Sequence, residues 1–273
     1  MGRFPCSKWG LLGIIAFVVI LMACTGAEEV AGPMGPRGEP GPQGPPGVTA
    51  PTQPPSEMFH ATASNVWIVG GYGDNFVYTG ENYTPTDGFL TIDVIDETNE
   101  GMLVAQWDVR DWKYDDSKPR ASGTMKVIWT DFFGQTDLTD FMDGGISNDL
   151  HLHGDSGQES PLLPTLYTYS AGWGSADVYL NDEMLYDHVV AHYMVTDGTR
   201  DPRTHAVHTR DGVGIFKPAP KGGDPGDGFT YPERILTHLV VHTDVLDRNN
   251  FPPFTMFMHI NFENTSISTA SQP

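Results

Sequence analysis

Residues 235–245 read ILTHLVVHTDV, and residues 254–262 read FTMFMHINF. In each stretch apolar side chains recur at every second position, which is the pattern of a β-strand with one buried face. The residues that share this face are Ile235, Thr237, Leu239, Val241 and Val245 in the first stretch and Met256, Met258, Ile260 and Phe262 in the second. The two stretches therefore predict neighbouring antiparallel strands in a mainly β domain.

The register of this strand pair decides where its histidines lie. We take Leu239 to lie opposite Ile260, which puts both apolar sets on one face of the sheet. His238 and His242 then lie on the other face, and His259 lies diagonal to both of them, within reach of their rings. A slip of one residue would move one set of histidines to the wrong face.

The rest of the chain after the N-terminal region also reads as strands and turns. Six more stretches are rich in β-branched and aromatic residues or alternate at period two: 66–69, 89–95, 102–109, 124–130, 177–180 and 184–195. Between the last two, Asn181-Asp182-Glu183 predicts a tight hairpin turn. The chain has 31 Gly and 22 Pro, and 140–164 and 218–232 read as long polar loops. We therefore predict an all-β fold, a single β-sandwich or jelly-roll head.

Three pairs of the ten histidines are spaced by two or four residues, so the members of each pair are expected to share a face of a strand. Neutral imidazoles that meet on one patch are usual ligands of transition metals. We predict a transition-metal site, with zinc or copper as the candidate ion. Its candidate ligands are His238, His242 and His259, followed by His188 and His192, and then by His151 and His153.

Gly145, His151 and His153 form the pattern Gly-x5-His-x-His, which resembles the start of the cupin metal motif. The resemblance implies a jelly roll in which both histidines bind the metal. The sequence departs from the family after this point. Glu159 comes later than the cupin pattern places its glutamate, and no second Gly-Pro-Gly-His motif follows.

The N-terminus has the features of an export signal. Arg3 and Lys8 precede an apolar run from 9 to 23, which is shorter than the ~20 residues that a membrane-spanning helix needs. Leu21-Met22-Ala23-Cys24 resembles the lipobox of bacterial lipoproteins. The resemblance implies removal of residues 1–23 and a lipid on the new N-terminal cysteine, which ties the protein to a membrane. The alternative is an uncleaved N-terminal anchor, which exports the remainder as well.

Cysteine usage agrees with this interpretation. Cys6 and Cys24 are the two cysteines, so cleavage leaves one thiol and no possible disulfide within the chain. Thr25 follows the lipidation site, where bacterial lipoproteins of the inner membrane carry aspartate. The resemblance therefore implies the outer membrane in a Gram-negative cell, with the head in the periplasm or at the exterior.

Glycine falls at every third position from Gly32 to Gly47. These positions make five proline-rich triplets, and Gly47 begins a sixth. This segment resembles a short collagen repeat, in which only glycine fits at the axis of three polyproline strands. It implies a homotrimer; the alternative is a monomeric spacer of ~50 Å. The predicted organisation is a signal peptide at 1–23, a lipidated cysteine with repeat and Pro/Thr linker at 24–55, a β-sandwich head at 56–266 and a disordered tail at 267–273.

The charge of the chain excludes one class of partner. The formal net charge is −20, and loss of the signal peptide leaves 13 basic against 35 acidic residues, a net charge of −22. Such a surface repels phosphate backbones, so we expect no nucleic-acid partner. Calcium is an alternative ligand, because oxygen-rich loops bind hard cations. The aspartates concerned are Asp131, Asp137, Asp140, Asp143, Asp224 and Asp227.

Three functions follow from these features. The first is an envelope-tethered binding module for a transition metal. The second is a lectin-like adhesive or structural module for an unknown extracellular ligand, in which tryptophans form a stacking platform; the candidates are Trp107, Trp112, Trp129 and Trp173. The third is a metal-dependent enzyme with Glu263 or Asp244 as general base. We rank the enzyme last, because no acid–base constellation accompanies the histidines.

Overall fold

The structure, a computed structural model, describes residues 57–133, 145–224 and 226–271. The predicted signal peptide, Cys24 and the collagen-like repeat lie outside these residues. The elements are β1 (Glu57–Val69), β2 (Tyr83–Thr86), β3 (Gly88–Ile95), β4 (Glu100–Trp112), β5 (Ala121–Phe132), β6 (Ile146–Leu152), β7 (Leu166–Leu180), β8 (Glu183–Gly198), the 3-10 turn η1 (Ala219–Lys221), β9 (Tyr231–His242) and β10 (Phe257–Ser271). The prediction of an all-β fold is confirmed.

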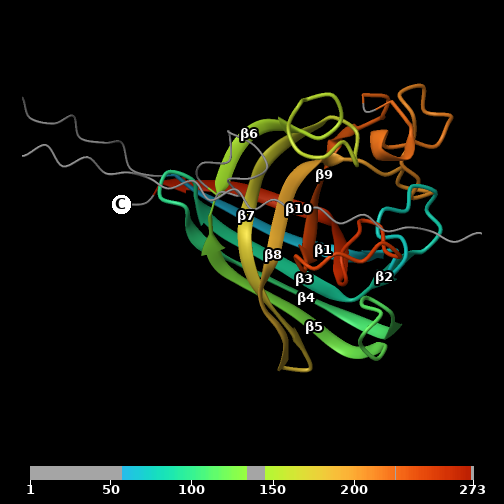
Figure 1. The fold of residues 1–273 in the computed structure, drawn as a ribbon. Helices are drawn as coiled ribbons and strands as arrows, with labels where there is room; N and C mark the ends of the chain where they lie inside the picture. Colours follow the sequence, from blue (N-terminus) through green and yellow to red (C-terminus); the bar gives the residue numbers. More distant parts are fainter. Residues whose placement is uncertain (1–56, 134–144, 225, 272–273) are drawn as a thin grey trace, which may run out of the picture. The chain divides into compact units, whose positions relative to one another are not determined.

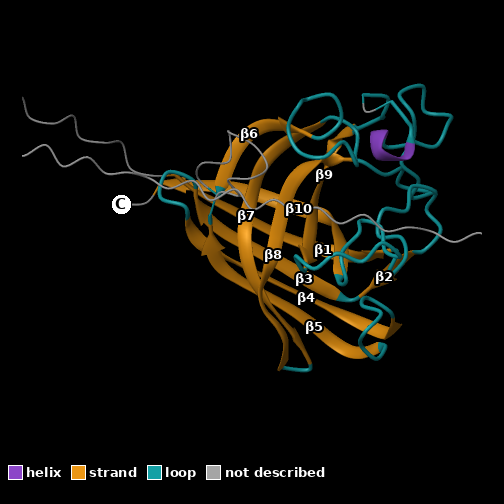
Figure 2. Ribbon diagram, in the orientation of Figure 1, coloured by secondary structure: helices purple, strands orange, loops and turns teal. Residues whose placement is uncertain are grey.

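Eight of these strands close into an antiparallel barrel (Figures 1 and 2). Their order is β10-β9-β8-β7-β5-β4-β3-β1, and β1 pairs back with β10 from Glu57 opposite Ser271 to Ile68 opposite Ile260. β2 pairs with β1, and β6 pairs with β7. The prediction of a β-sandwich or jelly roll is therefore wrong. A single sheet whose first and last strands meet has one enclosed interior, whereas a sandwich packs two separate sheets.

The inward side chains of the barrel form its core. Along β4, Leu103, Ala105, Trp107 and Val109 are all buried, as the period-two pattern predicts. The predicted strand pair is present with the expected register, Leu239 opposite Ile260. Apolar residues at period two therefore point inward, and the histidines between them point out of the barrel.

The turn between β7 and β8 also agrees with its prediction. Leu180 pairs with Glu183, so the loop has two residues, and both Asn181 (φ 52°) and Asp182 (φ 64°) lie in the left-handed region. Asparagine and aspartate tolerate this region better than most residues, which suits the tight turns of hairpins.

Two predicted boundaries differ from the structure. Residues 267–271 are the end of β10, paired with the start of β1, and are not a disordered tail. β6 lies within 140–164, which we expected to be a loop throughout. β6 is a short edge strand with mixed polarity, and its sequence ISNDLHL gives little periodic signal. Across the described residues, no helix is long and apolar enough to span a membrane.

A second apolar cluster covers the outside of the barrel. It combines outward residues of β7, β8 and β10 with residues from the long loops, most of which gather on one side of the barrel (Figure 2). Its buried members are Phe76, Tyr78, Leu152, Leu163, Leu166, Ala171, Trp173, Met194, Val207, Phe216 and Phe257. The outward face of β7 to β10 is therefore buried as well, and the histidines on it are shielded from water.

Candidate functional site

A cavity of about 570 Å³ lies between this outward face and the loops that cover it. Five of the ten histidines line it, together with one carboxylate and one thioether, and the remaining lining is mostly apolar or aromatic. The polar and sulfur-bearing residues are His153, Glu159, Ser160, His192, Met194, His238, His242 and His259. Below we call this cavity the histidine pocket.

Strand register explains why these side chains meet. His192 on β8 lies opposite Trp173 on β7 and opposite Val240 on β9, and Val240 lies opposite His259 on β10. The neighbouring row places Met194 opposite His238. In an antiparallel sheet, side chains in such rows stand about 4.5–5.5 Å apart at Cβ. The sheet therefore supplies most of the floor of the pocket.

Four of the five imidazoles are anchored in the same way. In each, Nδ1 lies within hydrogen-bonding distance of a backbone carbonyl. The pairs are His153 with Ser160 at 2.6 Å, His192 with Gly172 at 3.0 Å, His242 with Thr243 at 2.7 Å and His259 with Asn75 at 3.0 Å. A carbonyl only accepts, so we assign the ring proton to Nδ1, which leaves a lone pair on Nε2.

The fifth imidazole, His238, is bonded to another histidine and not to a carbonyl. His238 Nδ1 lies 3.2 Å from His259 Nε2, and both rings are buried. Since His259 Nε2 carries a lone pair, His238 donates from Nδ1, and its own Nε2 then accepts. That Nε2 is buried and has no hydrogen-bond partner among the described residues. The predicted contact of His259 with His238 is thus present, while His242 instead stacks on Phe254, with ring centroids 4.0 Å apart.

A second group of side chains occupies another wall of the pocket. The ring of His192 stacks on Trp173, and the ring centroids of His192 and His153 lie 6.5 Å apart. Trp173 donates its Nε1–H to Glu159 at 2.5 Å. His192 Nε2 is buried and unpaired among the described residues, and His153 Nε2 lies 3.2 Å from Met194 Sδ.

Burial keeps these imidazoles neutral. It lowers the pKa of His192 to about 4 and that of His259 to about 3, and it lowers the pKa of the other three as well. Burial also works against the charged form of Glu159, yet the pKa of Glu159 lies below its usual value, because the protonated forms of His192 and His153 attract the carboxylate at low pH and the Trp173 N–H donates to it. The pocket therefore offers several neutral nitrogen lone pairs beside one negative charge.

Two predicted ligands lie elsewhere. His188 is 72% exposed and faces Asp177 and Asp187. It has φ of 48° beside a break in the β7–β8 register, and this irregularity ends the even spacing that would align it with His192. His151 is exposed and packs against Tyr167, whereas His153 (φ 59°) has left the strand and enters the pocket. The cupin-like pair therefore does not act as one unit.

The described part of the chain contains no group of three or more His, Cys, Asp or Glu side chains close enough to hold a metal ion. Of the aspartates considered for calcium, Asp137, Asp140 and Asp143 lie outside the described residues. The four candidate tryptophans are buried, so packing of the core and the outer cluster accounts for them, and they form no exposed stacking platform.

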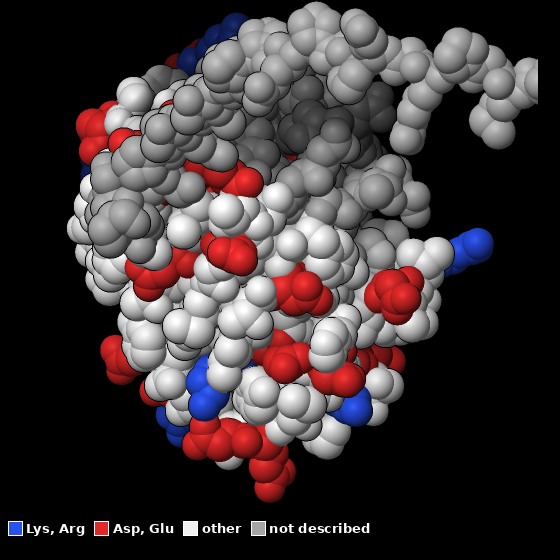
Figure 3. Space-filling view, turned by 90° about the vertical axis from the view of Figure 1, so that its left-hand side faces the viewer, with Lys and Arg blue, Asp and Glu red and all other residues white. Residues whose placement is uncertain are grey.

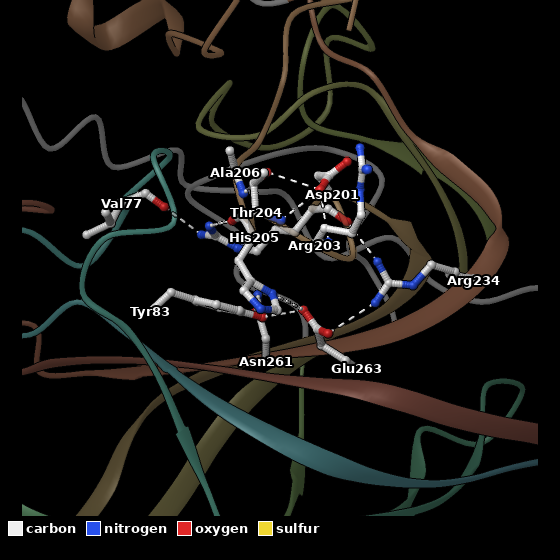
Figure 4. A network of polar contacts seen from close by, with 11 residues as sticks. Val77, Tyr83, Asp201, Arg203, Thr204, His205, Ala206, Arg234, Asn261 and Glu263 are labelled. Carbon is white, nitrogen blue, oxygen red and sulfur yellow. Dashed lines mark hydrogen bonds and ion pairs between the residues drawn. The ribbon is translucent and has the colours of Figure 1, made fainter. Parts of the chain in front are cut away.

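A separate polar network involves residues of β9, β10 and the loop after β8 (Figure 4). Glu263 accepts from Tyr83 Oη at 2.8 Å and from Arg234 Nη2 at 3.0 Å. Arg200 is buried over the ring of Tyr83 and donates to the backbone carbonyls of His205 and Val77. Glu263 and Asp244 do not line the histidine pocket. Because Arg234 on β9 joins Glu263 on β10 to the backbone of Arg200, the network fastens the loop after β8 to the barrel.

No family model, curated protein or solved structure matches this chain. We therefore infer the function from the site itself.

Sequence reasoning missed Met194, Glu159 and Trp173 as members of the pocket. Met194 follows His192 by two residues on a predicted strand, so the period-two rule already placed both on one face. Spacing gave no such signal for Glu159, which lies in a loop and comes too late for the cupin pattern, or for Trp173, which we considered only as part of an exposed stacking platform.

Proposed function

We propose that this protein binds a transition metal in the histidine pocket, as an envelope-tethered binding protein. The observation that carries the proposal is the common anchoring of four imidazoles by backbone carbonyls. Histidines that bind metals usually donate their second ring N–H to such a group, which fixes the tautomer and the direction of the ring. Neutral, anchored imidazoles are prepared to bind without loss of a proton.

The charge of the molecule supports a cationic ligand. Acidic side chains are spread over the face seen in Figure 3, with fewer basic ones among them. A surface of this sign raises the local concentration of cations. Glu159 supplies a negative charge inside the pocket itself, where low polarity strengthens its attraction for a metal ion.

Metal binding is tested on the full chain with Zn(II) and Cu(II) at micromolar concentration, by elemental analysis and calorimetric titration. We expect His192→Ala to weaken binding at least 10-fold, because its ring lines the pocket and its buried Nε2 has no hydrogen-bond partner among the described residues. His188→Ala is the matched control on the same strand and should leave the affinity unchanged, since that ring is exposed.

Two results would contradict the proposal. One is an absence of binding by the wild-type chain. The other is an equal loss in both variants, which would indicate binding by surface histidines. Circular dichroism on each variant shows whether the barrel is intact, and His242→Ala provides a second, half-buried pocket variant.

The tether is a separate part of the proposal and comes from the lipobox-like residues alone. In a bacterial host, Cys24→Ser should move the protein from the membrane fraction to the soluble fraction, because no acyl chain can then be attached. Labelling with a radioactive fatty acid should fail in parallel. Unchanged membrane retention of the variant would favour the uncleaved helical anchor instead.

A further inference from the structure

The imidazole of His153 has a hydrogen-bond acceptor next to each of its two ring nitrogens, although the neutral ring carries only one N–H. Its Nδ1 lies 2.6 Å from the Ser160 carbonyl oxygen, and its Nε2 lies 3.2 Å from the thioether sulfur of Met194. Both neighbours are acceptors, and neither has a proton to give. A neutral imidazole carries one N–H, and the closer and stronger acceptor, the carbonyl, takes it. The lone pair of Nε2 therefore faces the lone pairs of sulfur.

The repulsion between these lone pairs can be removed in two ways. A second proton on His153 would let Nε2 donate to the sulfur, but the ring is buried, and burial lowers its pKa. A metal ion next to both atoms would instead use both lone pairs. At metal–nitrogen and metal–sulfur bond lengths of about 2.0 and 2.3 Å, two ligand atoms of one ion lie about 3–4 Å apart. The observed 3.2 Å falls in that range.

The thioether narrows the choice of ion. Thioether sulfur is a soft ligand that favours Cu(I), and it contributes little to hard cations such as calcium. Imidazole suits copper as well. Met194 is 2% exposed and belongs to the outer cluster, so its sulfur lies in surroundings of low polarity, which favour an ion of low charge.

His192 supplies a third ligand atom. Its Nε2 is buried and unpaired among the described residues, and its strand position is two residues before Met194 on the same face. Imidazole centroids that share one ion lie about 5–6 Å apart, so the ring of His192 needs to approach His153 by about 1 Å from the present 6.5 Å. A set of two imidazoles and one thioether is also consistent with the absence of any compact group of His, Cys, Asp and Glu in the described chain.

Building on the proposed function, we infer that the metal is cuprous copper, held by His153 Nε2, His192 Nε2 and Met194 Sδ. Glu159, beside both imidazoles, balances the charge of the ion. The hydrogen-bonded pair of His238 and His259 does not coordinate the ion in this assignment, and it forms part of the pocket wall.

The test is an anaerobic titration of the full chain with Cu(I) in competition with a chromophoric chelator, run beside a titration with Zn(II). We expect Met194→Leu to weaken Cu(I) binding at least 10-fold and to change Zn(II) binding by less than 3-fold. Leucine is close to methionine in volume, so the packing is retained. Met184→Leu, on the same strand but 53% exposed, is the control and should bind as the wild type does.

X-ray absorption of the Cu(I) complex gives an independent readout, because a sulfur neighbour at about 2.3 Å should be present in the wild type and absent in Met194→Leu. Equal Cu(I) affinity in wild type and Met194→Leu would overturn the copper assignment while leaving the metal-binding proposal in place if Zn(II) still binds. A wild-type chain that binds neither ion would overturn both.

Discussion

Replacement of Glu263 by alanine is expected to lower the free energy of unfolding by about 3–5 kcal/mol, because it leaves buried cationic groups without their counter-charge. The carboxylate is 3% exposed and lies 3.0 Å from Arg234 Nη2. It also accepts from Tyr83. Arg200, fully buried over the Tyr83 ring, loses a negative neighbour in the same substitution.

The expected damage extends beyond one ion pair. Arg234 donates to the backbone carbonyl of Arg200 at 2.8 Å, and Arg200 in turn donates to His205 and Val77 (Figure 4). Without Glu263, the guanidinium of Arg234 is free to turn away from this network. The loop after β8 then loses its attachment to the barrel, which exposes the neighbouring outer cluster.

Chemical denaturation monitored by tryptophan fluorescence measures this effect. Glu233→Ala is the matched control, since Glu233 is an exposed acid thirty residues earlier on the adjacent strand β9 and should change stability by less than about 0.5 kcal/mol. Tyr83→Phe removes one bond to the carboxylate and should cost about 1–2 kcal/mol. A Glu263→Ala chain as stable as the Glu233→Ala chain would show that the buried network adds nothing to folding.

The strand pair at the C-terminus could be predicted because its sequence contains a complete two-sided pattern. Apolar residues at period two fixed the inward face of both β9 and β10, and only one register satisfied both. Closure of the barrel could not be predicted in the same way. It depends on the pairing of β1 with β10, strands from opposite ends of the domain, and an alternating strand looks the same in a sandwich and in a barrel.

The predicted positions of the histidine rings are right at some residues and wrong at others for one reason. Even spacing places side chains on one face only while the strand stays regular. It does so at His238, and the expected contact with His259 is present. At His188 the backbone departs from that geometry, and His153 lies just beyond the end of its strand, so spacing alone misplaced their rings. His153 joined the pocket through a loop, for which a strand rule gives no guidance.

Acid is expected to destabilise the metal-free protein well above the pH at which most of its carboxylates titrate. Burial holds the pKa of His192 at about 4 and that of His259 at about 3, against 6.5 in the unfolded chain. At pH values between the folded and the unfolded pKa of each histidine, the unfolded state binds more protons than the folded state. The free energy of unfolding therefore falls as the pH is lowered from about 6.5. At 1.36 kcal/mol per pKa unit, His192 alone accounts for roughly 3 kcal/mol by pH 4.

Urea denaturation at a series of pH values between 7 and 4.5, in the presence of a chelator, measures this dependence. His192→Gln should reduce the slope of unfolding free energy against pH by up to about 1.4 kcal/mol per pH unit, the value for one proton. His188→Ala should leave the slope unchanged, because that ring is exposed to water. The nearby Glu159 carboxylate opposes the shift by favouring protonated His192. A variant lacking His192 with the wild-type slope would therefore mean that Glu159 outweighs burial, and that the pocket holds an ion pair in place of the neutral lone pair that metal binding requires.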